Sequence, residues 1–181
     1  VSGALIGADA ALASDWRLGG VLGYSDLSSQ PQADANSYHA GLYTRGDIGP
    51  IDFVGGAIYT RNDISTRRDI AFGTFEDLLT ADYAGTTAQV FGDISWTLQT
   101  GDLSLQPFAN FAYVNLDTDD FTENGGAAAL SVMGRSSDVT TSTIGMRWSA
   151  RLLTGDLPLV ASGMLGWRHS AGDLMPVSLA A

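Results

Sequence analysis

Residues 140–153, T-T-S-T-I-G-M-R-W-S-A-R-L-L, contain the pattern that decides the fold. Between Ile144 and Leu152 the even positions are apolar, and the odd positions between them are glycine, serine or arginine. A repeat of two residues puts these sets on opposite faces of a β-strand, whereas on a helix they would spread around the cylinder. The stretch therefore predicts a strand with one apolar face. That face would be a core in a soluble sandwich, or a lipid contact in a transmembrane barrel.

The overall composition favours a sheet packed against an apolar environment. The chain has 181 residues, which is enough for one domain with a substantial core. Charged residues make up 16% of it, against about 25% in ordinary soluble domains. The absence of cysteine excludes a disulfide framework and thiolate chemistry.

The charge and the hydropathy exclude two further classes. A net charge of −11 argues against nucleic-acid binding, which needs clusters of lysine and arginine. We expect the acidic residues to lie in solvated loops. No stretch approaches the roughly 20 apolar residues of a membrane-spanning helix. No leader of basic and apolar residues opens the sequence, so we expect it to begin inside a longer product or after processing.

The period-two pattern recurs along the chain and predicts eight strands. They cover residues 1–13, 16–24, 36–48, 51–63, 82–98, 103–116, 140–153 and 159–170. Short turns are expected at 14–15, 49–50, 100–102 and 154–156. Long polar loops are expected at 25–35, 64–81, 117–137 and from residue 172 onward.

This alternation of short and long connections distinguishes two β architectures. Outer-membrane barrels have tight turns at one end and long loops at the other, and a Greek-key sandwich has no reason to separate them. We therefore predict an all-β, antiparallel, up-and-down transmembrane β-barrel, with residues 1–181 forming a single domain.

Most charged side chains in the predicted strands fall on the positions opposite the apolar residues. An arginine on the lipid face near the bilayer midplane would cost about 2–4 kcal/mol, so this segregation fits a barrel. We predict that the following residues line a polar lumen: Asp9, Arg17, His39, Arg45, Asp93, Arg147 and Arg151. Two roles remain open for them, a hydrated pore lining and internal ion pairs that hold the barrel's shape. Aromatic residues that fit a membrane-interface girdle are Trp16, Tyr38, Trp96, Trp148 and Trp167.

Several short motifs, in order, resemble those of a known family. They are G-A-D at 7–9, W-R-L-G at 16–19, L-Q-P-F-A at 105–109, S-T-I-G-M-R at 142–147 and G-W-R-H at 166–169. With these motifs, nearly the whole chain resembles the C-terminal β-domain, or translocator barrel, of bacterial type V autotransporters.

The resemblance implies an outer-membrane barrel of a Gram-negative cell that serves surface export of an N-terminal passenger domain. The family barrel has twelve strands, so the chain would supply about eight of them and be incomplete at both ends. The implied partners are outer-membrane lipid, the protein's own passenger domain, the barrel-assembly machinery and periplasmic chaperones. Neither bond chemistry nor a cofactor is implied.

The sequence offers weak support for other functions. Acidic residues between 117 and 123 could hold calcium, but they lack the glycine of an EF-hand loop. No nucleophile motif such as G-x-S-x-G is present, so we predict no catalytic, cofactor or metal site. One alternative is an outer-membrane enzyme whose site lies at the loop rim, with Asp117, Asp119 and Glu123 as its acids. The other is a soluble β-sandwich binding module, in which the aromatic face would be a core.

Overall fold

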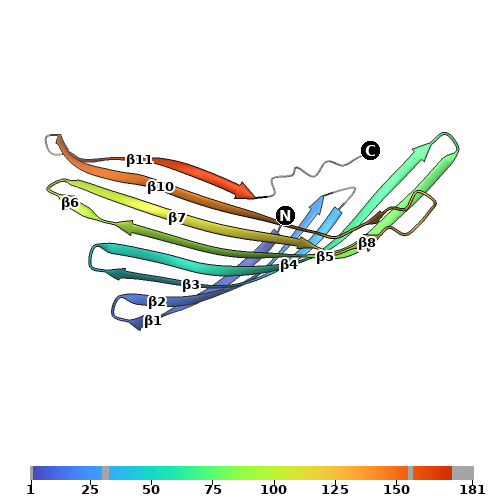
Figure 1. The fold of residues 1–181 in the computed structure, drawn as a ribbon, viewed down its shortest axis with the longest axis horizontal. Helices are drawn as coiled ribbons and strands as arrows, with labels where there is room; N and C mark the ends of the chain where they lie inside the picture. Colours follow the sequence, from blue (N-terminus) through green and yellow to red (C-terminus); the bar gives the residue numbers. More distant parts are fainter. Residues whose placement is uncertain (1, 30–32, 155–156, 173–181) are drawn as a thin grey trace.

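The structure is one long, curved antiparallel sheet (Figure 1). A computed structural model describes residues 2–29, 33–154 and 157–172. The strands are β1 (Ser2–Ala13), β2 (Trp16–Ser29), β3 (Ala33–Ile48), β4 (Ile51–Phe72), β5 (Phe75–Trp96), β6 (Leu98–Thr100), β7 (Leu103–Thr118), β8 (Phe121–Thr122), β9 (Ser131–Val132), β10 (Arg135–Thr154) and β11 (Leu157–Gly172). The described residues contain no helix long and apolar enough to cross a bilayer.

Eight strands run through the sheet in the order β1-β2-β3-β4-β5-β7-β10-β11. Each is antiparallel to its neighbours, so the connectivity is up-and-down, as predicted. The short strand β6 pairs with β7, and β8 and β9 form a small separate hairpin. The tight turns at 14–15 and 49–50 lie at the same end of the sheet, on the left in Figure 1.

Two of the predicted long loops are wrong, because the strands continue through them. Residues 25–35 extend β2 to Ser29 and start β3 at Ala33. Residues 64–81 form the outer half of the β4–β5 hairpin, which projects beyond the rest of the sheet (Figure 1). This hairpin turns at Gly73, whose φ of 63° is readily adopted by glycine. The third predicted loop, 117–137, is mostly confirmed, and residues 155–156 and 173–181 lie outside the described residues.

Apolar and polar residues alternate in the projecting half of the hairpin as they do in the lower half, but the apolar residues lie on the opposite face of the sheet. In lower β4, Phe53, Ala57 and Tyr59 share one face of the sheet. Beyond Tyr59 the apolar positions shift to the other face, where Ile64 and Ile70 lie. The period-two pattern of apolar residues is therefore interrupted at this point, and the interruption predicts a loop where the strand continues.

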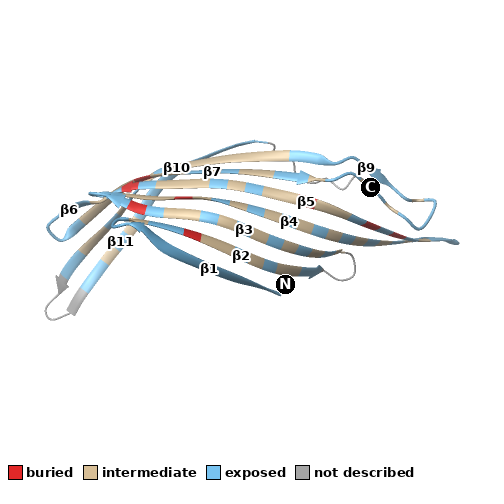
Figure 2. Ribbon diagram, turned by 90° about the horizontal axis from the view of Figure 1, so that it is seen from below, coloured by how far each residue is buried: buried red, intermediate tan, exposed pale blue. Residues whose placement is uncertain are grey.

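The apolar face of the sheet is its more exposed face, and exposed and half-buried residues alternate along strands such as β3 (Figure 2). Leu22, Leu42 and Tyr59 on this face are 62%, 66% and 52% exposed. Along β3 the alternating polar-face positions are less exposed than their neighbours. A soluble sandwich hides its apolar face, so the sandwich alternative is wrong for this chain.

The sheet is open at both edges. Within the described residues, β1 pairs only with β2, and β11 pairs only with β10. These two strands run antiparallel to each other, since an odd number of antiparallel steps separates them. Closure into a barrel therefore requires either their direct pairing or an even number of additional strands between them.

Candidate functional site

The two faces of the sheet are defined by the cross-strand register. The inner face carries all seven ionisable side chains predicted for the lumen, because the register places their positions on one side of the sheet. The outer face carries most of the exposed large apolar side chains, among them Leu22, Leu42 and Tyr59. The inner face is crowded: a Cβ added to Gly19 would lie 2.3 Å from Cζ of Tyr43.

The first polar cluster on the inner face joins β1 to β4. Arg17 Nε lies 2.5 Å from Asp9 Oδ2, an ion pair between neighbouring strands. Further along the sheet, His39 contacts Ser25 Oγ at 3.0 Å and Thr60 Oγ1 at 2.9 Å. His39, which lies on β3, therefore links this strand to β2 and β4 through side-chain hydrogen bonds.

The second polar cluster surrounds Arg147 on β10. Its guanidinium lies 3.6 Å from Asp93 Oδ2 on β5 and donates to Gln106 Oε1 on β7 at 3.4 Å. The same group lies 3.9 Å from the centre of the Phe108 ring, within cation–π range. Asn110 on β7 donates to the Gly92 carbonyl at 3.2 Å. These contacts tie three strands together across the inner face.

The predicted basic strip is therefore only partly paired with acids. Arg17 meets Asp9 and Arg147 meets Asp93. Arg45 is exposed and lies directly opposite Arg17, a cross-strand pair of like charge. Arg151 is exposed near the short-turn end, where its backbone N–H donates to the Asp102 carbonyl at 2.9 Å.

Sequence reasoning missed the apolar part of the inner face. Val21, Tyr43, Val54, Ile58 and Phe91 line a small cavity of about 230 Å³ there. A prediction based on the charged residues of this face does not include them. The strict alternation of the pattern does show that these apolar side chains share a face with Arg17 and Asp93.

A segment at the outer end of the sheet, residues 119–134, folds against the projecting hairpin, and we call it the strap. It starts along the free edge of β5 beyond the end of β7: Asp119 N–H donates to the Ala84 carbonyl, and Asn124 and Thr80 exchange two backbone hydrogen bonds of 2.8 and 2.9 Å. Phe121 stacks on Tyr83 with ring centres 4.3 Å apart. The strap covers a strand edge that would otherwise be unpaired.

Side-chain contacts from the hairpin hold the middle of the strap, residues 123–128. Arg68 on β4 makes a two-pronged contact with Glu123, with Nε–Oε1 at 3.1 Å, and also donates to the Ala128 carbonyl. Asp77 on β5 accepts from Ala128 N–H at 3.0 Å. Beneath these contacts Leu79 is fully buried. Local sequence patterns do not predict this pairing, since Arg68 and Glu123 are 55 residues apart and both lie in predicted loops.

The Arg68–Glu123 contact shifts the pKa values of both side chains. The hydrogen bond from Arg68 lowers the pKa of Glu123 below its ordinary value; partial desolvation opposes this, and the Leu130 N–H reinforces it. The same hydrogen bond raises the pKa of Arg68. The Glu123 side chain is only 11% exposed. Both groups are therefore charged at neutral pH.

The acids of the alternative enzyme site are not assembled into a cluster. Glu123 contacts Arg68, Asp117 lies within β7 opposite Thr86, and Asp119 is at the start of the strap. Among the described residues, no group of three histidine or acidic side chains could hold a metal ion.

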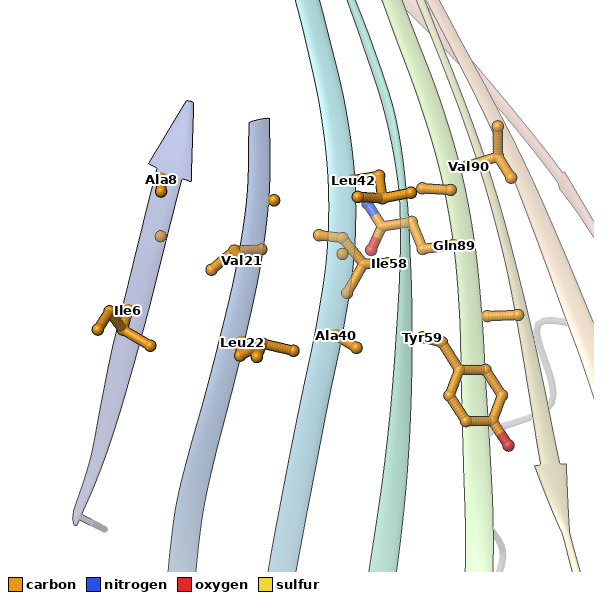
Figure 3. A pocket seen from close by; sticks show the side chains of 15 residues that line it. Ile6, Ala8, Val21, Leu22, Ala40, Leu42, Ile58, Tyr59, Gln89 and Val90 are labelled. Carbon is orange, nitrogen blue, oxygen red and sulfur yellow. The ribbon is translucent and has the colours of Figure 1, made fainter. Parts of the chain in front are cut away.

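A shallow apolar groove crosses the outer face over β1 to β5 (Figure 3). Its volume is about 820 Å³, and it lies between two rows of outer-face side chains. One row includes Ile6, Leu22 and Tyr59; the other includes Leu42 and Val90. With so little polar surface, the groove suits hydrocarbon and offers nothing for catalysis.

Aromatic side chains lie near both ends of this outer surface. Trp16 and Phe53 pack near the short turns with ring centres 5.8 Å apart. At the other end Tyr24 packs against Tyr38 at 5.4 Å. Two aromatic rows flanking an apolar band are typical of a membrane barrel.

Comparison with known proteins agrees with this geometry. The family model described as "Autotransporter beta-domain" matches residues 1–181. Two proteins named extracellular serine protease from Serratia marcescens are 35% and 34% identical over 176 residues, covering 95% of this chain. The chain spans 17% of the length of these relatives.

Two solved structures share the fold. The translocator domain of the autotransporter NalP from Neisseria meningitidis has a TM-score of 0.62 and 21% identity, covering 91% of this chain and 58% of that one. The beta domain of the Bordetella autotransporter Brka has a TM-score of 0.62 and 23% identity, covering 94% and 71%. The chain thus belongs to the autotransporter β-domain family, the outer-membrane translocators that serve passenger export.

Proposed function

We propose that residues 1–181 act as one domain that forms most of the wall of an outer-membrane translocator, and that its passenger is attached on the N-terminal side. The observation that supports this most directly is the exposure pattern, in which the apolar face is uncovered and the ionic groups lie on the crowded inner face. Lipid can cover an apolar face of this size, and a polar chain in transit needs a polar wall.

On this proposal the seven inner-face residues line the lumen. The Arg147 cluster and the two exposed arginines have different consequences. Arg147, held by Asp93, Gln106 and Phe108, links three strands and so stabilises the wall. Arg45 and Arg151 are exposed, and so would keep the lumen hydrated and positively charged.

The open edges of β1 and β11 support a larger barrel. An unpaired strand edge in the bilayer leaves backbone groups without partners, at a cost of several kcal/mol for each group. Further strands of the same protein, inserted with help from the barrel-assembly machinery and periplasmic chaperones, would remove these edges.

The reversal of phase in β4 and β5 supports a position for the outer surface of the bilayer. Up to Tyr59 most apolar residues of β4 face outward, with Val54 and Ile58 as exceptions, and from Ile64 onward most of them face inward. The same change occurs in β3, where Tyr38 and Leu42 face outward but Ala33 and Ala35 face inward. We place the boundary at the row that contains Tyr24, Tyr38 and Arg61, which the register puts side by side.

The height of the apolar band agrees with this boundary. Trp16 and Tyr24 on β2 are eight residues apart, or about 26 Å along the strand at about 3.3 Å per residue. A strand tilt of about 40° reduces this to roughly 20 Å, close to the roughly 25 Å band of outer-membrane barrels.

Cysteine labelling tests the boundary, because the chain contains no cysteine of its own. Ala57→Cys and Ser65→Cys lie on the same outer face of β4 and differ only in height. In intact outer membranes, a water-soluble maleimide should label S65C rapidly and A57C hardly at all. Equal labelling of the two positions would refute the boundary.

Export itself is tested with the full-length protein that carries this chain, expressed in a Gram-negative host. We expect its N-terminal portion to become accessible to protease added outside the cells. Deleting residues 1–181 should leave that portion protected. Exposure of the N-terminal portion without these residues would contradict the proposed function.

A further inference from the structure

The strap and the projecting hairpin form a small unit outside the membrane with its own core. A two-stranded hairpin alone is marginally stable in water. Here Leu79 and Ala81 on the inner face of β5 are 0% and 2% exposed, although most of the sheet has no buried side chains. Phe121 of the strap stacks on Tyr83 of the same strand. The strap therefore supplies the second layer that this hairpin lacks.

The strap lies on the inner side of the hairpin, the side that faces the lumen on the proposed function. Arg68, Asp77 and Leu79 all occupy inner-face positions of β4 and β5. The strap contacts the first two directly and buries the third. The strap lies beside the projecting hairpin at the outer end of the sheet (Figure 1).

Two glycines fit the strap closely against β5. Gly125 has a φ of 127°, and a Cβ there would lie 2.0 Å from the Leu78 carbonyl oxygen. A Cβ on Gly126 would lie 2.1 Å from Asp77 Oδ1. The backbone contact and the positive φ require glycine at position 125, and a Cβ at position 126 would displace the Asp77 side chain, so the strap packs closely against the hairpin.

We propose that the strap is a latch across the outer mouth of the translocation lumen, that Arg68 and Glu123 are the positioning residues that hold it closed, and that it must swing away for a polypeptide to leave. The inference rests on the proposed export function. The side-chain contacts from the hairpin reach Glu123 and Ala128 in the middle of the strap, while residues 119–122 continue directly from β7. This arrangement suits a segment that pivots at residue 119 and releases at Glu123.

A disulfide between strap and hairpin tests the latch. Thr80 and Asn124 exchange two backbone hydrogen bonds, so their Cα atoms should be about 5.5 Å apart, within the range that a disulfide spans. The double variant T80C/N124C is made in the full-length protein, and each single variant is its control. We expect the double variant to cross-link and its passenger to stay inaccessible to external protease. A reducing agent should restore exposure to the level of the single variants.

The outcomes separate the latch from the proposed function. Normal exposure of the passenger by a fully cross-linked double variant would overturn the latch, while the single variants still demonstrate export. No exposure by the wild-type protein would instead refute the export function.

A second variant tests the positioning residues. Glu123→Gln keeps the side chain's size and removes its charge, so the cross-linking rate of T80C/N124C should fall several-fold. Glu76→Gln, near the hairpin tip, makes the same charge change away from the Arg68 contact and should leave the rate unchanged. Equal cross-linking rates in the two variants would rule out Glu123 as the residue that holds the latch.

Discussion

At the scale of single residues, two neighbouring glycines on opposite faces of β2 differ in how closely they are packed. Gly19 and Gly20 are adjacent on β2 but point to opposite sides. A Cβ at Gly19 would meet the Tyr43 ring at 2.3 Å, whereas one at Gly20 would meet Leu42 Cδ2 at 3.5 Å, an ordinary contact. The inner position therefore requires glycine and the outer one does not.

We predict that Gly19→Ala destabilises the folded domain by about 1–3 kcal/mol, because the ring of Tyr43 must move within a crowded surface. Gly20→Ala should be neutral or slightly stabilising, since an alanine loses less conformational entropy than a glycine when the chain folds into a strand. Urea unfolding of both variants in detergent micelles measures the difference. Equal stability of the two variants would show that the inner face is not packed as described.

The ion pair of the strap makes a prediction about pH. The pKa of Glu123 is lowered on folding, so its contribution is complete above the ordinary value of about 4.5 and disappears as the pH falls through the lowered value. Spin labels at Leu78→Cys and Val132→Cys, both exposed, should give a narrow distance distribution at pH 7 and a broad one near pH 3.

The control is the same labelled pair with Glu123→Gln, which should broaden the distribution at both pH values. Asp77 and Asp120 also accept hydrogen bonds in this region, and the comparison isolates the part due to Glu123. A distribution that stays narrow at pH 3 would contradict the prediction.

At the scale of elements, each strand is a boundary between two environments. In β5, Gln89 lies on the inner face and Val90, 51% exposed, lies on the outer face. The alternation is constant below the Tyr59 level and reversed above it, because the solvent changes from lipid to water on the outer side. The element is thus continuous while its apolar side switches.

We predict that Val90→Arg destabilises the domain by about 2–4 kcal/mol, the cost of a lipid-facing arginine near the bilayer midplane. Gln89→Arg places the same side chain one residue away, on the polar face, and should cost much less. Unfolding in lipid vesicles compares the two. A larger loss for Q89R than for V90R would reverse the assignment of the faces.

At the scale of the whole molecule, the open edges of β1 and β11 determine behaviour in isolation. Unpaired edges in an apolar medium seek other strands, so a chain with two of them should self-associate. Barrel closure removes this tendency, because every backbone group then has a partner.

We therefore predict that the 181-residue chain, refolded in detergent micelles, runs as multimers without a heat-dependent change of mobility on a denaturing gel. The domain with its further strands should give one monomeric band that shifts on heating. A monomeric, heat-shifted band from the 181 residues alone would show that β1 and β11 pair directly into an eight-stranded barrel.

Much of the fold follows from local patterns. The alternation around Trp148 identifies a strand and its two faces, and the register confirms that Arg17, Asp93 and Arg147 share one side. The connections were harder to predict. Residues 64–81 were assigned to a loop because their apolar positions shift phase, although Ile64, Arg68 and Ile70 still alternate within β4.

By itself the sequence determined the strand period, the separation of polar and apolar faces and the membrane environment, because each depends on residues that are close in the chain. Only the tertiary structure decided which charges meet. Arg147 reaches Asp93 across β7, and Arg68 holds Glu123 from a hairpin 55 residues away. Such pairs depend on register and on the path of a loop, and neither is encoded in a local pattern. The same reason explains why the strap could not be foreseen.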